Sequence, residues 1–284
     1  MFILPLTLVC LVIPLSVTSQ QCPISAGRVS SSQLKSLQAS RLEVALDLLR
    51  TVTSLDPSQN IFLSPDSIYS AFQLLYFASS GRTEQILRRF LHLPNGMTKS
   101  TMVGAYIMDR KYAQDQSINP QETHEIDSAN RIYIQRGLHV NRCVNNIFSH
   151  EIASVDFLNQ LKPTVKSING WVEKVTKHMI KDLLPEGFLN ANARLVLVNA
   201  VYFRGLWKTK FQKSKTYQDN FYLADGSRKS VKMMHTEDKF RVFASNNFGV
   251  QGIELPYVGE DVSMFIIMPQ QSGRSAIPNL LRSL

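Results

Sequence analysis

The feature that most constrains the fold of this chain is a near-continuous apolar run at residues 195–203, Leu-Val-Leu-Val-Asn-Ala-Val-Tyr-Phe. A short apolar run that is rich in β-branched residues predicts a strand buried on both faces of a sheet. Asn199 is the polar exception in the run, and a buried amide without a hydrogen-bond partner is costly. The run therefore predicts a covered sheet in which Asn199 needs a partner.

Helices are predicted mainly in the first half of the chain, where apolar residues recur at helical spacing. The first helix is predicted at 34–52, and the second starts at Ser64-Pro65. Thr83 is predicted to cap the third helix, in which Ile86, Leu87 and Phe90 face inward. A weakly patterned helical stretch lies within 97–127, and a long helix runs through 165–179 and ends at Leu184-Pro185. At Ser64-Pro65 the serine hydroxyl can accept a free backbone amide, and proline suits the first helical position.

Short strands dominate the second half of the chain. Their predicted positions, besides the apolar run, are 61–63, 129–134, 152–157, 221–223, 240–244, 250–256 and 262–268. Gly226, Asn246-Asn247 and Gly259 mark turns between the later strands. Because no repeat and no separating linker occurs, this order predicts an α+β domain in which helices pack on large mixed or antiparallel sheets.

The N-terminus has the residue pattern of an export signal. Residues 1–19 are uncharged and nearly all apolar, with a short hydrophobic core at Leu6–Leu15 and small residues at 17–19. This pattern is typical of a signal peptide. A membrane anchor is the alternative, but the run is short and no stop-transfer flank follows. We therefore predict a signal peptide at 1–19, a flexible arm at 20–33 and a folded domain at 34–284, in a secreted, extracellular protein with no membrane attachment after cleavage.

The C-terminus ends inside a new apolar stripe. Ile277, Leu280, Leu281 and Leu284 are spaced as one face of an amphipathic helix, with no C-cap or polar tail after them. A natural domain end rarely leaves such a face uncovered. We therefore expect the domain to be truncated at this point.

The cysteines do not form a disulfide framework. Signal cleavage would remove Cys10 and leave Cys22 and Cys143. Two cysteines are too few for a stapled scaffold. The sequence leaves open whether they pair or one of them stays free.

Sequence motifs for catalysis are absent. The chain contains no Gly-x-Ser-x-Gly elbow, Cys-x-x-Cys pair, phosphate-binding loop or dinucleotide fingerprint. His124-Glu125 and His150-Glu151 begin a zinc-helix pattern but lack the second histidine four residues after the first. We therefore predict no enzyme, no metal site and no cofactor. Nucleic-acid binding is not predicted either, because no aromatic-studded basic motif occurs.

The net charge of +9 is concentrated in the middle of the chain, where residues 162–241 carry 16 basic and 7 acidic side chains. On the predicted long helix, Lys174, Lys177 and Lys181 would share one face. One interpretation is a polyanion site, such as a glycosaminoglycan patch. The simpler interpretation is a solvated lysine-rich face.

A series of motifs in chain order resembles the serpin family of serine protease inhibitors. The first motif, Asn-Ile-Phe-Leu-Ser-Pro-Asp-Ser-Ile at 60–68, is similar to the family pattern at the start of its second helix. Further matches lie at 80–86, 129–133, 168–173, 180–184, 195–207, 219–222, 231–234, 253–257 and 263–269. The variant at 76–81 resembles arthropod members. The resemblance covers nearly all of residues 34–284, and an ordered series of this length is specific.

The resemblance implies a mechanical function. A typical serpin holds a reactive loop above a five-stranded sheet. A serine protease cleaves the loop and becomes acyl-linked to it, and the loop then inserts between strands 3 and 5. Ser64, Ser67 and Asn199 match the shutter, the polar network beneath the point where these strands part, and Trp207 matches the breach, where insertion begins. Hydroxyls and an amide suit the shutter because their hydrogen bonds can be exchanged as strands separate.

By the same resemblance, strand 5, the reactive bond and the hinge that separates inhibitory from non-inhibitory serpins would follow residue 284. We therefore predict a secreted serpin that, when full-length, acts as a monomer and inhibits a serine protease of unknown identity. The alternative is a non-inhibitory serpin or a truncated isoform with a binding or carrier role.

Overall fold

The computed structural model describes residues 26–284 apart from 58, 118–123, 139 and 141, so the predicted signal peptide lies outside the described residues. The chain forms two compact units. The first contains the described residues of Met1–Ala45, Phe62–Asn119 and Ile126–Tyr202, and the second contains those of Leu46–Ile61, Pro120–Glu125 and Phe203–Leu284. Helix α1 (Ser31–Leu55) contributes residues to both units.

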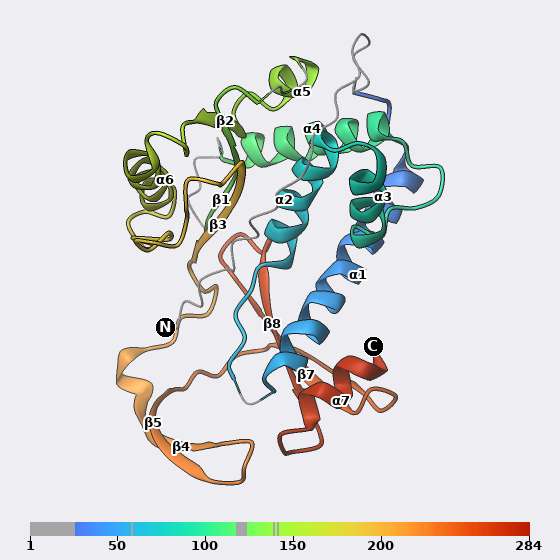
Figure 1. Cartoon of the computed structure of the whole chain (residues 1–284). Coiled ribbons are helices and arrows are strands. Elements are labelled where there is room, and N and C mark those ends of the chain that lie inside the picture. The colour runs from blue at the N-terminus through green and yellow to red at the C-terminus, as the bar shows by residue number, and fades with distance from the viewer. Residues whose placement is uncertain (1–25, 58, 118–123, 139, 141) are drawn as a thin grey trace. The chain divides into compact units, whose positions relative to one another are not determined.

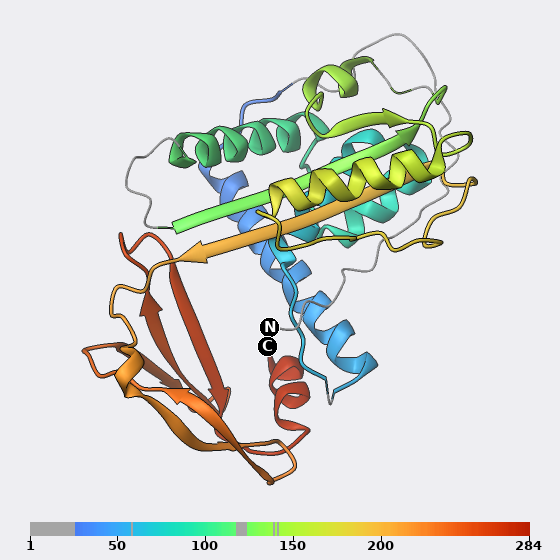
Figure 2. The same ribbon diagram turned by 90° about the vertical axis from the view of Figure 1, so that its left-hand side faces the viewer.

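A three-stranded sheet forms the centre of the first unit, in the order β2 (Ile152–Val155), β1 (His124–Gln135), β3 (Leu195–Gly205). Strands β1 and β2 are parallel, with Ile132 opposite Ile152. Figure 2 shows that β1 and β3 run in opposite directions. The sheet is therefore mixed, and its strand β3 contains the apolar run.

Helix α6 (Leu161–Val175) covers one face of this sheet (Figure 2). Its fully buried Ile168 and Val172 share an apolar cluster with Val196 and Val198 of β3. Because side chains alternate along a strand, the residues between these valines face the other side of the sheet.

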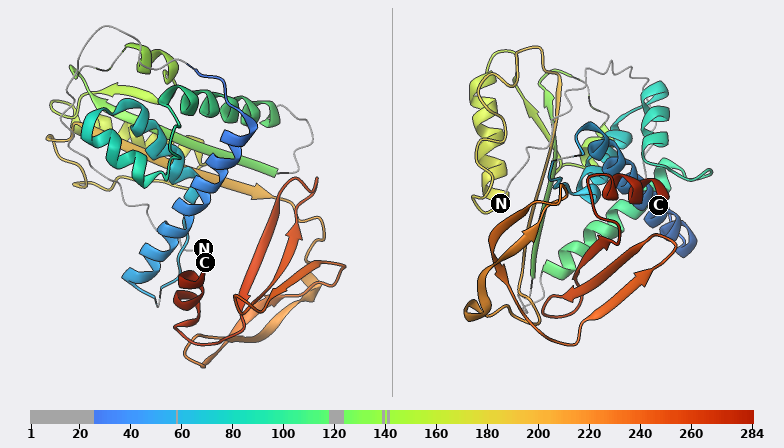
Figure 3. Two further views of the ribbon diagram at one scale, coloured as in Figure 1. Left: turned by 90° about the vertical axis from the view of Figure 1, so that its right-hand side faces the viewer. Right: turned by 90° about the horizontal axis from the view of Figure 1, so that it is seen from below.

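Helices α2 (Pro65–Ala78) and α4 (Lys99–Ser117) lie on that other side (Figure 3). Aromatic rings hold them together. Phe77 of α2 stacks on Phe148 with the ring centroids 5.0 Å apart, and Tyr106 of α4 meets both rings at steep angles. The first half of β3 is thus buried on both faces, as the apolar run predicts.

Within residues 26–33 of the predicted flexible arm, Gly27 is hydrogen-bonded to α4 and residues 31–33 are helical. The Gly27 amide donates to the Ser100 carbonyl at 2.8 Å. A Cβ at Gly104 would lie only 2.1 Å from the Gly27 oxygen, so α4 approaches the arm at a glycine. Helix α1 then begins at Ser31, three residues before its predicted start.

The second unit is built mainly of antiparallel strands. Its elements after β3 are η1 (Lys213–Lys215), a hairpin of β4 (Thr216–Tyr222) and β5 (Arg228–Met234), a sheet of β6 (Arg241–Ser245), β7 (Val250–Pro256) and β8 (Ser263–Pro269), and α7 (Ala276–Ser283). Strand β7 matches its predicted range, and β6 and β8 differ from theirs by one residue. The apolar pattern does not reveal β5, because basic and hydroxyl side chains occupy most of it.

Helix α7 forms where the C-terminal apolar stripe predicts a helix. Leu281 is buried, whereas Ile277 and Leu284 remain about half exposed. Arg50 of α1 donates from Nε to the Leu281 carbonyl at 3.0 Å, within the second unit. No helix among the described residues is long and apolar enough to span a membrane.

The predicted strand at 61–63 is wrong. The segment has no regular secondary structure and joins no ladder among the described strands, and the Phe62 side chain is 74% exposed. Three apolar residues form a strand only where a partner supplies hydrogen bonds. The apolar composition here was therefore misleading.

The predicted start of the third helix is also wrong. Helix α3 (Gly81–Phe90) begins two residues before Thr83, with Ser80 as its N-cap residue. Gly81 has a φ of +59°, a conformation that glycine adopts without steric cost, so the turn into the helix occurs there. Ile86, which was predicted to face inward, is 48% exposed, whereas Leu87 is buried.

The remaining short helix is α5 (Arg142–Ile147).

Candidate functional site

A polar network joins β3, β1 and α2 within the first unit. The side-chain amide of Asn199 donates to the Ser67 carbonyl at 3.0 Å, and it also contacts the Ser67 hydroxyl and Oδ1 of Asn130. Asn199 faces α2 because its neighbours Val198 and Ala200 belong to the core beneath α6. The partner that the apolar run requires for Asn199 is therefore supplied by α2.

This network contains more acceptors than amide hydrogens. The Asn199 amide carries two N–H groups, while three oxygens lie within reach of it. The Ser67 hydroxyl can itself rotate and donate. Since Ser67 is only 2% exposed, water does not readily replace a lost bond. The arrangement thus permits several hydrogen-bond patterns among the same atoms.

Ser64 lies at the start of α2 as its N-cap residue. Its side chain makes no capping hydrogen bond, although its carbonyl accepts the Ile68 amide at 3.1 Å and Pro65 occupies the start of the helix. The backbone of Ser64 is extended, with φ −113° and ψ 93°. The predicted side-chain cap is therefore wrong. Of the three predicted shutter residues, the structure brings Ser67 and Asn199 together.

Trp207 belongs to the second unit and lies in an aromatic cluster. Its ring stacks on Tyr257, with centroids 4.4 Å apart and 13° between the planes, and the Phe211 ring approaches it at 6.1 Å. The backbones of Trp207 and Tyr257 also form an isolated β-bridge. Next to the bridge, Lys208 pairs with Glu260 at 2.7 Å. Burial raises the pKa of Tyr257.

Gly205 is required by this cluster. A Cβ at Gly205 would lie 2.5 Å from Cδ1 and 2.7 Å from Cε1 of Tyr257, closer than real Cβ contacts. The Phe203 ring packs on the same tyrosine at 5.1 Å. Sequence reasoning missed both Gly205 and Tyr257. The available signal was a glycine inside a strand pattern, which often marks a close approach.

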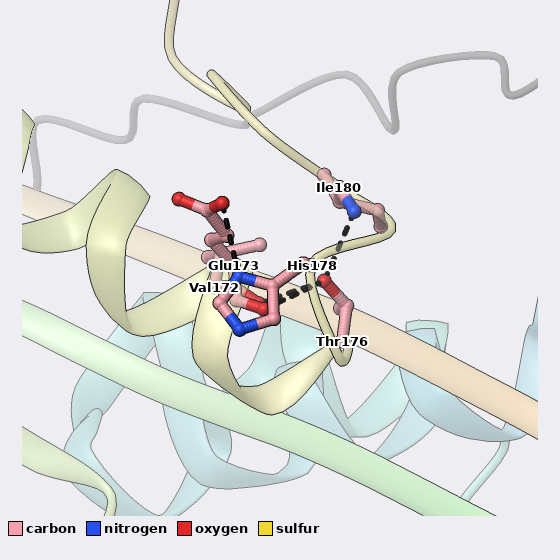
Figure 4. Close-up of polar contacts among 5 residues, drawn as sticks. All are labelled: Val172, Glu173, Thr176, His178 and Ile180. Carbon is pink, nitrogen blue, oxygen red and sulfur yellow. Dashed lines mark hydrogen bonds and ion pairs between the residues drawn. The ribbon is translucent and has the colours of Figure 1, made fainter.

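Helix α6 ends at Val175 in a compact turn, which Figure 4 shows. The Thr176 hydroxyl donates to the Val172 carbonyl at 2.9 Å and accepts the Ile180 amide at 3.1 Å. The His178 amide donates to the Glu173 carbonyl at 2.7 Å, a pattern that closes helices at a left-handed residue. The His178 ring also lies 3.1 Å from the Glu173 carboxylate.

The three predicted patch lysines do not share a helical face. Lys174 lies in the last turn of α6, whereas Lys177 follows the helix with a left-handed φ of 52° and Lys181 lies beyond the turn. The prediction of one face failed because the helix ends nine residues before the predicted Leu184. The left-handed turn then redirects the chain.

A charged cluster joins α1, α2 and α4 in the first unit. Arg41 pairs with Asp109 and lies 3.7 Å from Asp66. Burial alone would lower the pKa of Arg41, but the two carboxylates outweigh it and the pKa is raised. The guanidinium also lies 5.4 Å from the Tyr69 ring centroid. Burial raises the pKa of Tyr69 to about 12, and its hydroxyl has no hydrogen-bond partner among the described residues.

A second cluster is centred on the buried carboxylate of Glu151. Its Oε1 accepts the Tyr106 hydroxyl at 3.1 Å and pairs with Arg110 at 2.8 Å. Burial is the largest cause of the raised pKa of Tyr106, and the negative charge of Glu151 raises this pKa further. In the described part of the chain, no group of three or more His, Cys, Asp or Glu side chains could hold a metal ion.

The chain belongs to the serpin (serine protease inhibitor) family, which it matches over residues 39–284. Among curated relatives, serine protease inhibitor 88Ea of Drosophila melanogaster is 30% identical over 280 residues, covering 93% of this chain and 65% of the relative. Leukocyte elastase inhibitor of Sus scrofa is 32% identical over 245 residues, covering 83% and 62%. The chain thus spans a little less than two thirds of the length of these relatives.

Solved serpin structures share the fold of this chain. Emu ovalbumin aligns with a TM-score of 0.77 at 22% identity, covering 88% of this chain and 67% of ovalbumin. Maspin aligns with a TM-score of 0.80 at 23% identity, covering 89% and 67%. The predicted α+β serpin fold is therefore confirmed.

Proposed function

We propose that the whole protein to which this chain belongs is an exported, monomeric inhibitor of a serine protease, not an enzyme, and that it acts by insertion of a cleaved loop into its main sheet. Family membership supports the class of function, and relatives from a fly and a pig are named as inhibitors. The observation that carries the mechanism is the network of Asn199, Ser67 and Asn130.

Loop insertion requires β3 to part from a neighbouring strand without leaving buried polar atoms unpaired. The Asn199 network suits this task, because the amide can exchange one of its three acceptor oxygens for another. We assign Ser67 and Asn199 to the shutter on this basis, with Asn130 as a further member. Ser64 and Trp207 keep their proposed places, in the shutter and at the breach, from the resemblance alone.

Export is supported by two features. Residues 1–19 have the composition of a signal peptide. Cys143 is disulfide-bonded, and disulfides persist mainly in oxidising compartments. Its partner cysteine lies outside the described residues, so the pairing with Cys22 that the sequence leaves open is not tested. Recovery from the medium of a chain that begins at Gln20 would support export, and retention of the uncleaved chain in the cell would refute it. An arthropod origin also stays a prediction, because the fly and pig relatives match at similar identity.

The inhibitory mechanism is tested with the product of the complete reading frame. The protein is incubated with trypsin-like, chymotrypsin-like and elastase-like proteases, and complexes that survive denaturing electrophoresis are measured. We expect such a complex with at least one protease. Cleavage of the protein without a stable complex in every case would refute inhibition by loop insertion.

A matched pair of variants connects the test to the network. Asn199→Ala should increase the fraction of inhibitor that is cleaved without forming a complex, because the shutter is altered. Lys166→Gln, on the exposed surface of α6, should leave that fraction unchanged. If the fraction cleaved without forming a complex is the same in both variants, Asn199 has no part in the mechanism.

The second candidate is a non-inhibitory serpin with a binding or carrier role. The observation that favours it is the likeness to ovalbumin and to a tumour-suppressing serpin, whose names describe no protease inhibition. The same protease panel separates the two candidates, since a carrier would be cleaved without a stable complex.

A further inference from the structure

A local excess of positive charge lies in residues 203–241 of the second unit, away from the predicted lysine patch. Residues 203–241 carry ten basic and four acidic side chains, which accounts for six of the nine net positive charges. Three of the four carboxylates already have partners. Asp219 lies 3.7 Å from His235, Asp225 accepts the Ser227 hydroxyl and faces Arg274, and Asp238 accepts the Thr209 hydroxyl. The basic side chains of this segment thus outnumber the carboxylates available to neutralise them.

One face of the β4–β5 hairpin, labelled in Figure 1, contains no carboxylate. The antiparallel register and the alternation of side chains along each strand define this outer face. Its members are Thr216, Gln218, Asn220, Tyr222, Arg228, Ser230, Lys232 and Met234. All of them except Thr216 are exposed, whereas Val231 and Met233, on the opposite face, are half-buried. Asp219 and Lys229 belong to that opposite face.

The two cations of the outer face are spaced along one strand. Arg228 and Lys232 are four residues apart on β5, a separation of about 13 Å at the usual rise per residue. Within the described residues, neither makes an ion pair. Between them, the Ser230 hydroxyl donates to the Gln218 side-chain oxygen at 3.0 Å, which orients both polar groups across the hairpin.

This arrangement is complementary to a linear polyanion. A guanidinium fork can bind an oxyanion with two parallel hydrogen bonds, and an ammonium can bind a second anionic group further along the same chain. The amide and hydroxyl groups between them can bond uncharged polar groups of the ligand. No carboxylate on this face repels an approaching anion.

We infer that the outer face of the β4–β5 hairpin binds a sulfated polysaccharide. The choice of this ligand over nucleic acid rests on the proposed export, because sulfated polysaccharides are the polyanions that an extracellular protein meets. The site replaces the patch of Lys174, Lys177 and Lys181, whose common helical face does not form.

The test is chromatography of the 284-residue chain on immobilised heparin, with the salt concentration at elution as the readout. A sulfonate cation exchanger serves as a control for net charge. The variant Arg228→Gln/Lys232→Gln should bind heparin about tenfold more weakly near physiological salt, with a shallower salt dependence. The matched control, Lys174→Gln/Lys181→Gln, removes the same charge from the α6 region and should lose much less. Lys229→Gln, beside Arg228 but on the opposite face, is the local control.

Three results would overturn the inference. The first is an equal loss of heparin affinity in the two double variants, which would indicate an effect of net charge alone. The second is elution of the unaltered chain from heparin at the same salt as from the sulfonate resin. The third is displacement from heparin by single-stranded nucleic acid more effectively than by soluble heparin, which would make the ligand class wrong. Export is measured separately by sequencing the N-terminus of the secreted chain, so its failure is distinguishable from failure of heparin binding.

Discussion

Replacement of Asn199 by alanine tests whether the polar network stabilises the fold. The change removes up to two N–H···O bonds, each contributing about 0.5–1.5 kcal/mol net, and it leaves oxygens of the buried Ser67 unpaired, which costs about 1–3 kcal/mol. We expect Asn199→Ala to lower the free energy of unfolding by about 2–4 kcal/mol. That is a large fraction of the roughly 5–15 kcal/mol that stabilises a typical domain.

Urea denaturation followed by tryptophan fluorescence measures the effect. Asn199→Asp keeps the shape of the side chain but replaces the donor with a second oxygen, so it should destabilise the protein at least as much. A double-mutant cycle with Ser67→Ala should give a coupling of about 1 kcal/mol, because the two side chains are in contact. A cost below about 0.5 kcal/mol for Asn199→Ala, or additivity with Ser67→Ala, would refute a stabilising network.

Three further perturbations have defined outcomes. Gly205→Ala should destabilise the protein by about 1–3 kcal/mol through overpacking against Tyr257, and denaturation in a Tyr257→Leu background should show a smaller cost; an unchanged cost would contradict the clash. Tyr69→Phe should cost little at pH 7, where the buried hydroxyl has no described partner. Because the folded-state pKa of Tyr69 is raised from 10.0 to about 12, the parent should lose up to about 3 kcal/mol of stability as the pH rises from about 10 to 12, and the phenylalanine variant should lose less; equal losses in alkaline denaturation would contradict this. His178→Gly should stabilise the protein by about 0.5–1 kcal/mol, since the φ of 64° is strained for any residue with a Cβ, whereas His178→Ala should not; thermal unfolding of the two variants compares them.

The architecture was predictable from sequence where a pattern depends on burial alone. The apolar run predicted a covered strand, and β3 is buried on both faces along its first half. By contrast, β5 lies on an exposed hairpin, so its polar composition does not indicate a strand. The left-handed end of α6 was missed because histidine and lysine occupy positions where glycine would have given a local signal.

The candidate site was predictable in part. A polar residue within an apolar strand indicates that a partner is needed, and the sequence therefore singled out Asn199. It could not identify Asn130, because that contact joins residues 69 positions apart and depends on the strand order β2-β1-β3. Tyr257 was missed for the same reason. Its stacking on Trp207 arises from a bridge between distant backbone segments.

The two tryptophans of the chain lie one in each compact unit. Trp171 lies in the first unit, with the Arg131 guanidinium 4.4 Å from its ring centroid, and Trp207 lies in the second unit on the face of Tyr257. A charged group above one indole and a phenol ring against the other should give the two different emission spectra. Single-tryptophan variants would therefore report on each unit separately, and the order in which the units unfold could be observed without any added label.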